Sequence, residues 1–258
     1  GFWLGTYEDI LTYPKANETQ AEFARKKIRS RVNDPKVAEM LCPTSHPIGT
    51  KRMPLETGYY EVYNQPNVEL VDIKATPIEV VTESSLKTTQ TEYEFDMLIL
   101  ATGFDTVTGS LDRIDIRGSN GVSLKEKWVD GPRTYLGMGS SGFPNLFTLV
   151  GPHNGATFCN IPRCIEQNVE WVSDCIEHMT KNDIRRIEPN KDAEDRWTEH
   201  VQDVASGSLL TKTDSWFMGA NIPGKPRQMY LYAGGSPLYR KTCDDVASNN
   251  YEGYTLQK

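Results

Sequence analysis

The sequence predicts an α/β fold, and three observations carry the prediction. Residues 97–101 and 146–151 are apolar runs with a glycine at or just after the end, a pattern typical of strands buried on both faces of a parallel sheet. The third observation is a long amphipathic helix expected over residues 162–182, where apolar residues recur at spacings of four and three. This stripe consists of Ile165, Val169, Val172, Ile176 and Met179. Buried strands followed by a long helix are typical of the α/β class.

The first part of the chain predicts helices. Residues 18–32 are expected to form a helix capped by Asn17, and Asp34 is expected to cap a second, short helix. Phe23 and Ile28 are the only large apolar residues in the middle of the first helix. They bury little surface, so we expect this helix to pack against another part of the protein.

The remaining elements follow from shorter patterns. Strands are expected at 68–72, 78–81 and 92–95, where residues are β-branched or alternate in polarity. A helix is expected near 193–205, with Trp197, Val201 and Val204 facing inward. The segment 206–235 is rich in glycine and proline and is expected to run over the surface, before a last short helix at 244–247.

Composition narrows the class of protein. The chain has 258 residues, 38% hydrophobic and 24% charged, which is typical of a globular protein. A net charge of −7 argues against general nucleic-acid binding, which needs a positive field along the phosphates. No apolar run approaches the ~18 residues that span a bilayer. The first residues contain no secretory signal pattern, so we expect a cytoplasmic protein.

Cysteine and histidine usage gives no metal or disulfide pattern. The five cysteines contain no C-x-x-C pair, so we expect neither a disulfide framework nor a zinc site, and the usage fits a reducing compartment. The four histidines are scattered along the chain and are interpreted as surface or hydrogen-bonded core residues.

Residues 137–142 read G-M-G-S-S-G, which has the literal spacing of a dinucleotide-binding fingerprint. That fingerprint needs a helix directly after it, because the pyrophosphate binds at the helix N-terminus. Pro144 and an apolar run follow instead, so we interpret the segment as a glycine-rich loop before a buried strand. The sequence then holds no credible nucleotide fingerprint, and no P-loop, serine-hydrolase or zinc-protease motif.

Short segments spread along the whole chain carry a family resemblance. They are I-G-T-K-R at 48–52, Y-Y-E at 59–61, N-V at 67–68, A-T-G-F-D at 101–105, G-F-P-N-L-F at 142–147, I-E-Q with E-W-V at 165–172, S-W at 215–216 and G-A-N-I-P-G-K at 219–225. Each is weak alone, but their order and spacing are specific. Together they resemble the C-terminal half of the Baeyer–Villiger monooxygenases, class B flavin enzymes of the cyclohexanone and phenylacetone monooxygenase type.

The resemblance implies part of a flavoprotein fold with two dinucleotide-binding domains, one for FAD and one for NADPH. Both glycine-rich fingerprints lie in the family's N-terminal half and are missing here, as is its F-x-G-x-x-x-H-x-x-x-W signature. On this layout, residues 1–49 would end a helical insertion and residues 50–95 would be the C-terminal part of the NADP-binding domain. Residues 96–258 would be the C-terminal half of the FAD-binding domain.

The resemblance also implies a catalytic residue. In this family a flavin peroxide attacks a ketone, and the adduct collapses to an ester or lactone. Arg52 matches the arginine that would stabilise the developing negative charge and hold the nicotinamide, because a guanidinium stays charged and offers several donors. Lys51 matches the lysine that meets the 2′-phosphate of NADPH. The alternative is an ordinary Lys-Arg pair on the surface.

Five further cofactor contacts are implied by the resemblance. Trp216 would line the substrate and NADP pocket, or else pack a loop onto the core. Asn160 and Ile161 precede the long helix, where the family brings backbone to the flavin ring and a helix N-terminus favours negative charge. Thr102 and Gly103 would end a strand beside the FAD site, or form an ordinary turn.

Three functions remain open from the sequence. The first is one part of an FAD- and NADPH-dependent monooxygenase, inactive without its N-terminal half; it predicts exposed apolar surface where that half packs, or self-association. The second is a recruited, flavin-free fragment that steers a substrate or binds a partner. The third is weak NADP binding through Lys51 and Arg52 alone. Under all three hypotheses, this chain by itself is expected to bind no FAD.

Overall fold

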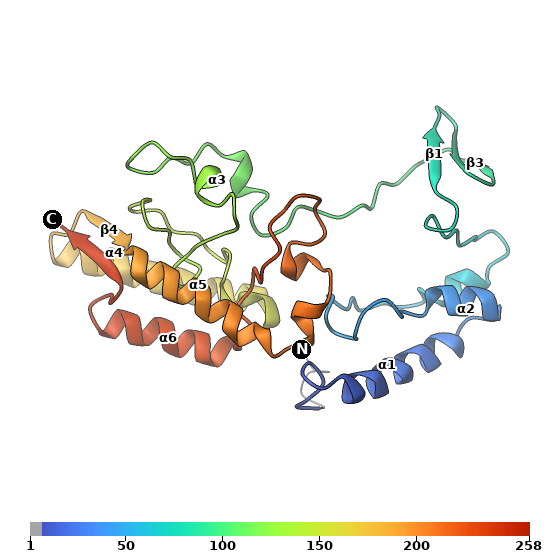
Figure 1. The fold of residues 1–258 in the computed structure, drawn as a ribbon, viewed down its shortest axis with the longest axis horizontal. Helices are drawn as coiled ribbons and strands as arrows, with labels where there is room; N and C mark the ends of the chain where they lie inside the picture. The colour runs from blue at the N-terminus through green and yellow to red at the C-terminus, as the bar shows by residue number, and fades with distance from the viewer. Residues whose placement is uncertain (1–6) are drawn as a thin grey trace. The chain divides into compact units, whose positions relative to one another are not determined.

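The computed structural model describes residues 7–258 (Figure 1). The first six residues of the segment 1–49, expected to end a helical insertion, lie outside the described residues. The chain divides into two compact units. The large unit comprises Gly1–Pro14, Gly49–Lys51 and Phe104–Lys258, and the small unit comprises Lys15–Ile48 and Arg52–Gly103.

The small unit contains two helices, a 3₁₀ turn and a three-stranded antiparallel sheet. The helices are α1 (Pro14–Arg29) and α2 (Pro35–Leu41), and the 3₁₀ turn is η2 (Glu61–Asn64). The sheet has the order β1-β2-β3, with β1 (Ile78–Val81), β2 (Ser85–Thr88) and β3 (Glu92–Glu94). The strands expected at 78–81 and 92–95 are therefore confirmed.

The two helix starts in the small unit differ in outcome. Asp34 caps α2 as expected, accepting a hydrogen bond from the backbone nitrogen of Lys36 at 2.7 Å. The cap predicted at Asn17 is wrong, because α1 begins at Pro14. Asn17 is buried and bonds instead with both the backbone nitrogen and oxygen of Ile48, each at 2.9 Å.

Residues 68–72 and 97–101 form no strand, contrary to expectation. In the second run Met97, Ile99 and Leu100 are 77%, 77% and 76% exposed. A strand exists only when a neighbour pairs with its backbone groups, and no segment of the described chain pairs with 97–101. The run has the composition of a buried strand, but residues 7–258 contain no strand that pairs with it.

The large unit is built on three helices. These are α4 (Ile161–Lys181), α5 (Lys191–Ser206) and α6 (Ser236–Ser248), which lie alongside one another (Figure 1). The strands β4 (Arg186–Pro189) and β5 (Tyr254–Gln257) pair antiparallel. Short elements complete it: η3 (Leu111–Arg113), α3 (Leu124–Lys127), η4 (Gly155–Phe158), η5 (Leu209–Lys212) and η6 (Trp216–Met218).

One hydrophobic core joins the three helices. Trp171 of α4, Trp197 of α5 and Tyr239 of α6 all belong to it. The expected helices at 162–182 and 193–205 are confirmed as α4 and α5, while α6 is longer than the predicted 244–247 because it begins at Ser236, directly after Gly235. Part of 206–235 enters this core rather than running over the surface, including Phe217 and Tyr232.

The apolar stripe expected on α4 lies at the edge of this core. Val172 and Met179 pack against the core, whereas Ile165, Val169 and Ile176 are exposed. The buried positions of the helix are Cys164, Gln167, Asn168, Trp171 and Cys175. The bulky Trp171 places its indole against Tyr251 and donates to the backbone oxygen of Cys243 at 2.9 Å, which fixes the buried face. The large unit thus leaves three residues of the expected apolar stripe of its longest helix uncovered.

The run 146–151 is a turn and not a buried strand. Val150 has a positive φ of 54°, which a regular strand does not allow. Its backbone nitrogen bonds to the side chain of Asn168 at 3.1 Å, and Thr148 bonds to the backbone of Gly137 and Met138. Side chains and loops therefore satisfy this backbone in place of strand partners. Among the described residues, no helix is both long and apolar enough to cross a membrane.

Candidate functional site

Four backbone amides of the segment 137–142, those of residues 138, 139, 141 and 142, are already hydrogen-bonded. The segment forms turns, and no helix follows it. The backbone nitrogen of Ser141 donates to the Glu194 carboxylate at 2.8 Å, and that of Gly142 donates to Glu188 at 2.6 Å. Two carboxylates already occupy the positions that an anion would take, so the interpretation as a glycine-rich loop holds.

The Lys-Arg pair lies at the boundary of the two units. Lys51 belongs to the large unit and Arg52 to the small unit, and both side chains are exposed. In the described part of the chain, neither forms an ion pair within 4.0 Å. The preceding residue, Thr50, is fully buried and accepts a hydrogen bond from the Thr213 hydroxyl at 2.8 Å. The backbone directly before Lys51 is therefore anchored in the large unit.

Trp216 opens η6, shortly after Thr213. Its indole is half-buried and packs edge-on against Phe217, with ring centroids 4.4 Å apart. Phe217 in turn contacts Phe158 at 5.5 Å, also edge-on. Phe158 ends η4, just ahead of Asn160. This row of three aromatic rings connects the Trp216 segment to the N-terminus of α4.

Asn160 and Ile161 form the start of α4. Asn160 is the N-cap residue by backbone geometry, but its side chain makes no capping hydrogen bond. Both residues are exposed, so the first amides of α4 are presented at the surface of the large unit. Within this unit, hydrogen bonds and ring contacts thus relate three of the predicted positions: Lys51, Trp216 and the pair 160–161.

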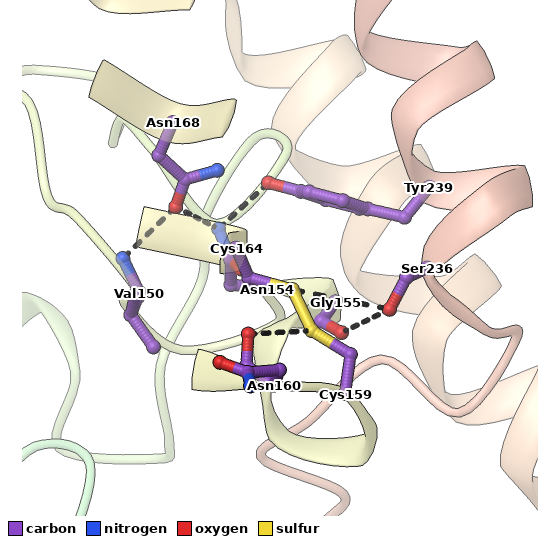
Figure 2. The surroundings of a disulfide bond; sticks show 9 residues. All are labelled: Val150, Asn154, Gly155, Cys159, Asn160, Cys164, Asn168, Ser236 and Tyr239. Carbon is purple, nitrogen blue, oxygen red and sulfur yellow. Dashed lines mark hydrogen bonds between the residues drawn. A yellow bond between two sulfur atoms is a disulfide. The ribbon is translucent and has the colours of Figure 1, made fainter. Parts of the chain in front are cut away.

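Figure 2 shows a disulfide at this helix start, between Cys159 and Cys164. No disulfide framework is expected from the sequence, because the five cysteines contain no C-x-x-C pair. The bond that the structure shows joins cysteines five positions apart, a spacing that does not by itself predict a disulfide. It forms because one cysteine precedes the helix and the other lies in its first turn, a proximity that depends on where α4 begins.

Two polar residues of the motif at 219–225, Lys225 and Asn221, hold the Trp216 segment against residues 104–106. Lys225 donates to the carboxylate of Asp105 at 2.6 Å and to the backbone oxygen of Thr106 at 2.8 Å. Asn221 donates to the backbone oxygen of Phe104 at 3.1 Å. The motifs at 101–105 and 219–225 carried the resemblance, but only their contact in space shows why both are needed.

Thr102 and Gly103 lie in the small unit and are exposed. They end no strand, because the run before them is unpaired. Gly103 has a φ of +90°, a conformation that favours glycine, and a Cβ there would meet open space. The structure relates neither these residues nor Arg52 to the positions in the large unit.

His153 is a buried histidine with a strongly lowered pKa. It is fully buried, and its Nδ1 lies 3.1 Å from the Thr134 hydroxyl, while its Nε2 has no hydrogen-bond partner in the described structure. Burial lowers the pKa of its imidazole to about 3. In the described residues, no group of three or more His, Cys, Asp or Glu side chains is arranged to hold a metal ion.

The chain is similar in sequence and structure to known monooxygenases. No protein-family model matches the chain. It is 49% identical over 261 aligned positions to a 2-oxo-Δ³-4,5,5-trimethylcyclopentenylacetyl-CoA monooxygenase of Pseudomonas putida, covering 99% of this chain and 48% of that protein. A Baeyer–Villiger monooxygenase of Pseudooceanicola batsensis is 42% identical over 98% of this chain and 46% of its own length. The crystal structure of OTEMO with FAD and NADP superposes with a TM-score of 0.93 at 49% identity, covering 97% of this chain and 46% of that one.

The chain belongs to the Baeyer–Villiger monooxygenase family, whose C-terminal half it matches. It spans about half the length of the curated relatives that it matches. The resemblance drawn from short motifs is therefore confirmed, and so is the fold class: a partial α/β flavoprotein fold, matched by solved structures over nearly the whole chain. The roles of individual residues, and the domain limits at 49 and 95, stay predictions.

Proposed function

We propose that this chain forms one half of an FAD- and NADPH-dependent monooxygenase that inserts an oxygen atom beside a ketone carbonyl, giving an ester or lactone. It would act only together with the N-terminal half of that enzyme. The observation that carries the proposal is the chain's 49% identity to a monooxygenase of which it spans 48%. The whole protein's activity is inferred from these relatives.

Two uncovered apolar surfaces support the need for a second half. In the small unit, Met97, Ile99 and Leu100 are about three-quarters exposed, at 77%, 77% and 76%. In the large unit, three residues of the α4 stripe, Ile165, Val169 and Ile176, are exposed. Isolated apolar residues on a surface are common, but contiguous runs and stripes mark surfaces that bind other protein segments.

The residues of this chain suit some groups of FAD and NADPH but not their pyrophosphates. The exposed ammonium of Lys51 suits a 2′-phosphate, and the exposed N-terminus of α4 suits a flavin ring that carries negative charge. The loop 137–142 does not fit a pyrophosphate, because its amides bind Glu194 and Glu188. The pyrophosphate groups would therefore be bound by the N-terminal half. When bound, FAD and NADPH supply the activated oxygen and the reducing equivalents.

The chain's own residues would orient the substrate and stabilise charge. The Arg52 guanidinium would hold the negative charge that develops on the ketone oxygen, and would position the nicotinamide. Trp216 would wall the pocket with its ring. Backbone at Asn160 and Ile161, and at Thr102 and Gly103, would contact the flavin. In this proposal residues 50–95 belong to the NADP-binding domain and residues 96–258 to the FAD-binding domain.

The first test uses the chain by itself. Absorbance and size-exclusion elution are recorded with and without added FAD. We expect a colourless protein that self-associates through its apolar surfaces. A yellow, flavin-loaded monomer would refute the need for the other half. A colourless, compact monomer would favour the flavin-free alternative, in which the fragment steers a substrate or binds a partner.

The second test restores the missing half. This chain is co-expressed with the part of the 49%-identical Pseudomonas putida relative that it does not cover. We expect a one-to-one, flavin-containing complex that converts cyclopentanone to its lactone with NADPH. Ile176→Lys should weaken the complex, whereas Val129→Lys, at an exposed apolar residue outside the α4 stripe, should not.

The same complex tests Arg52. Arg52→Ala should lower lactone formation by about 10²–10³-fold, the usual effect of removing one charge-stabilising group, while flavin absorbance is kept. Arg113→Ala, at another exposed arginine, is the matched control and should keep full activity. Equal activity of the two variants would remove Arg52 from the catalytic role.

A further inference from the structure

The disulfide encloses the start of α4. Cys159 lies just before the helix and Cys164 in its first turn (Figure 2). The four residues between them include Asn160, the N-cap, and Ile161, the first helical residue. The bond therefore controls the segment of the large unit that presents helix amides at the surface.

The other three cysteines are poor sites for the same chemistry. Cys42, Cys175 and Cys243 are buried free thiols. Burial raises the pKa of all three, that of Cys175 to about 11 and that of Cys243 to about 12. A thiol reacts as its thiolate, so these side chains are protected from oxidation. Cys164 is also buried, at 6% exposed, but it differs from these three in its surroundings. It lies against the half-buried Cys159 at the N-terminus of α4, where the helix dipole favours a thiolate.

The surroundings of the disulfide are anchored on one side and free on the other. Asn154 bonds to Asn168 at 2.9 Å and to Tyr239 at 2.7 Å, all within the buried interior (Figure 2). The Ser236 hydroxyl lies 3.9 Å from the Cys164 sulfur, so a reduced thiol would have a polar neighbour. The enclosed residues Asn160 and Ile161 have no comparable anchor and are exposed in the structure as described.

Reduction of the bond would remove a covalent restraint from this segment. The bond links residues on either side of the helix start, whose Cα atoms are 7.1 Å apart. Asn154 keeps its own hydrogen bonds to Asn168 and Tyr239 whether or not the bond is present, so the restraint acts on the enclosed residues.

We propose that Cys159 and Cys164 are a reversible dithiol pair, oxidised by hydrogen peroxide, whose disulfide fixes the segment of Asn160 and Ile161 at the start of α4. One thiolate attacks an oxygen of the peroxide, the O–O bond breaks, and a sulfenic acid and a hydroxide result. The second thiolate attacks that sulfur, the S–O bond breaks, and a second hydroxide leaves as the disulfide forms. Each hydroxide takes up one of the protons that the two thiols released, so two waters are produced. A dithiol reductant restores both thiols by two exchange steps.

This pair also reconciles the disulfide with the reducing compartment that the cysteine usage suggests. In such a compartment the two thiols stay reduced until peroxide appears. The inference does not depend on the proposed oxygenation, because it concerns this chain without any cofactor. Its test can therefore succeed or fail independently of that proposal.

The test follows the thiols of the chain by itself. The reduced protein is treated with hydrogen peroxide and blocked with an alkylating reagent, and its peptides are identified by mass spectrometry. Of the five cysteines, we expect Cys159 and Cys164 to lose reactivity together, linked within one chain, while the other three stay thiols. Dithiothreitol under native conditions should restore both. Cys159→Ser and Cys164→Ser should abolish the link, and Cys42→Ser should keep it.

A second readout uses the wild-type chain and so does not depend on whether a variant folds. Amide hydrogen exchange over 155–166 should be several-fold slower in the oxidised than in the reduced protein, with α5 unchanged. The proposal is overturned if both cysteines stay alkylatable after peroxide, or if they pass to sulfinic acid without linking. A disulfide that dithiothreitol cannot reduce in the folded chain would also overturn it, since the bond would then be permanent.

Discussion

The Thr213 hydroxyl donates a hydrogen bond to the Thr50 hydroxyl at 2.8 Å, joining residues 163 positions apart within the large unit. Both threonines are buried. Thr50 directly precedes Lys51, and Thr213 lies shortly before Trp216. One buried contact thus sets the backbone positions from which two predicted cofactor-binding residues extend.

Thr213→Val keeps the shape of the side chain but removes this hydrogen bond. We expect the free energy of unfolding to fall by about 1 kcal/mol, the usual net contribution of one such bond. Urea denaturation followed by tryptophan fluorescence measures the change. Thr255→Val, on the exposed side of β5, is the control and should have little effect. Equal losses in the two variants would show that the hydroxyl contact is unimportant.

Lys225→Met should loosen the connection between 104–106 and the Trp216 segment. The lysine side chain is only 9% exposed and bonds to both Asp105 and Thr106, so its charged hydrogen bonds are worth about 1.5–3 kcal/mol. Local opening should then rise about tenfold or more, seen as faster amide exchange in both segments. Lys212→Met, at an exposed lysine of η5, should leave exchange unchanged. Unchanged exchange in the Lys225 variant would contradict this role.

Lys127→Met should leave a buried carboxylate without its partner. Glu194 is 2% exposed, and Lys127 donates to it at 2.9 Å. Loss of one member of a buried ion pair costs about 3–5 kcal/mol. Lys125→Met, its exposed neighbour in α3, is the control and should cost little. If chemical denaturation shows a similar loss in the free energy of unfolding for both variants, the pair of Lys127 and Glu194 does not stabilise the fold.

The pH dependence of the same variant has a definite sign. Burial raises the pKa of the Glu194 carboxyl above its usual value, and Lys127 opposes this. Removing Lys127 should raise that pKa further, so the carboxyl takes up a proton more readily in the folded state. A group with a raised pKa favours folding below its unfolded pKa and loses this contribution as pH rises. The destabilisation by Lys127→Met should therefore be smaller at pH 5 than at pH 8.

His153 should make the fold sensitive to mild acid. Its pKa is lowered to about 3 by burial, against 6.5 for an exposed histidine. A group with a lowered pKa stabilises the fold above its unfolded pKa, and that contribution is lost as pH falls. Between pH 6.5 and 5 the loss should reach about 2 kcal/mol. His153→Gln should reduce this loss, while His200→Gln, at an exposed histidine, should retain it. Equal acid sensitivity in wild type and His153→Gln would rule out this histidine as the cause.

The sequence by itself determined what depends on neighbouring residues. Apolar spacing located α4 and α5, and the Asp34 side chain fixed the start of α2, because a helix is specified by its own periodicity and caps. Pro144 after G-M-G-S-S-G was enough to reject a nucleotide fingerprint. The order of short motifs identified the family, because the motifs follow one another here at the same spacing as in that family.

Only the tertiary structure decided which partners these elements meet. Periodicity shows that α4 has an apolar stripe but not that the face of Trp171, beside this stripe, is the more deeply buried one. The run 97–101 has the composition of a buried strand, yet a strand needs a neighbour to pair with its backbone. Lys225 finds Asp105 only through the fold. Each of these outcomes depends on contacts between residues distant in sequence, and local patterns carry no information about which distant group arrives.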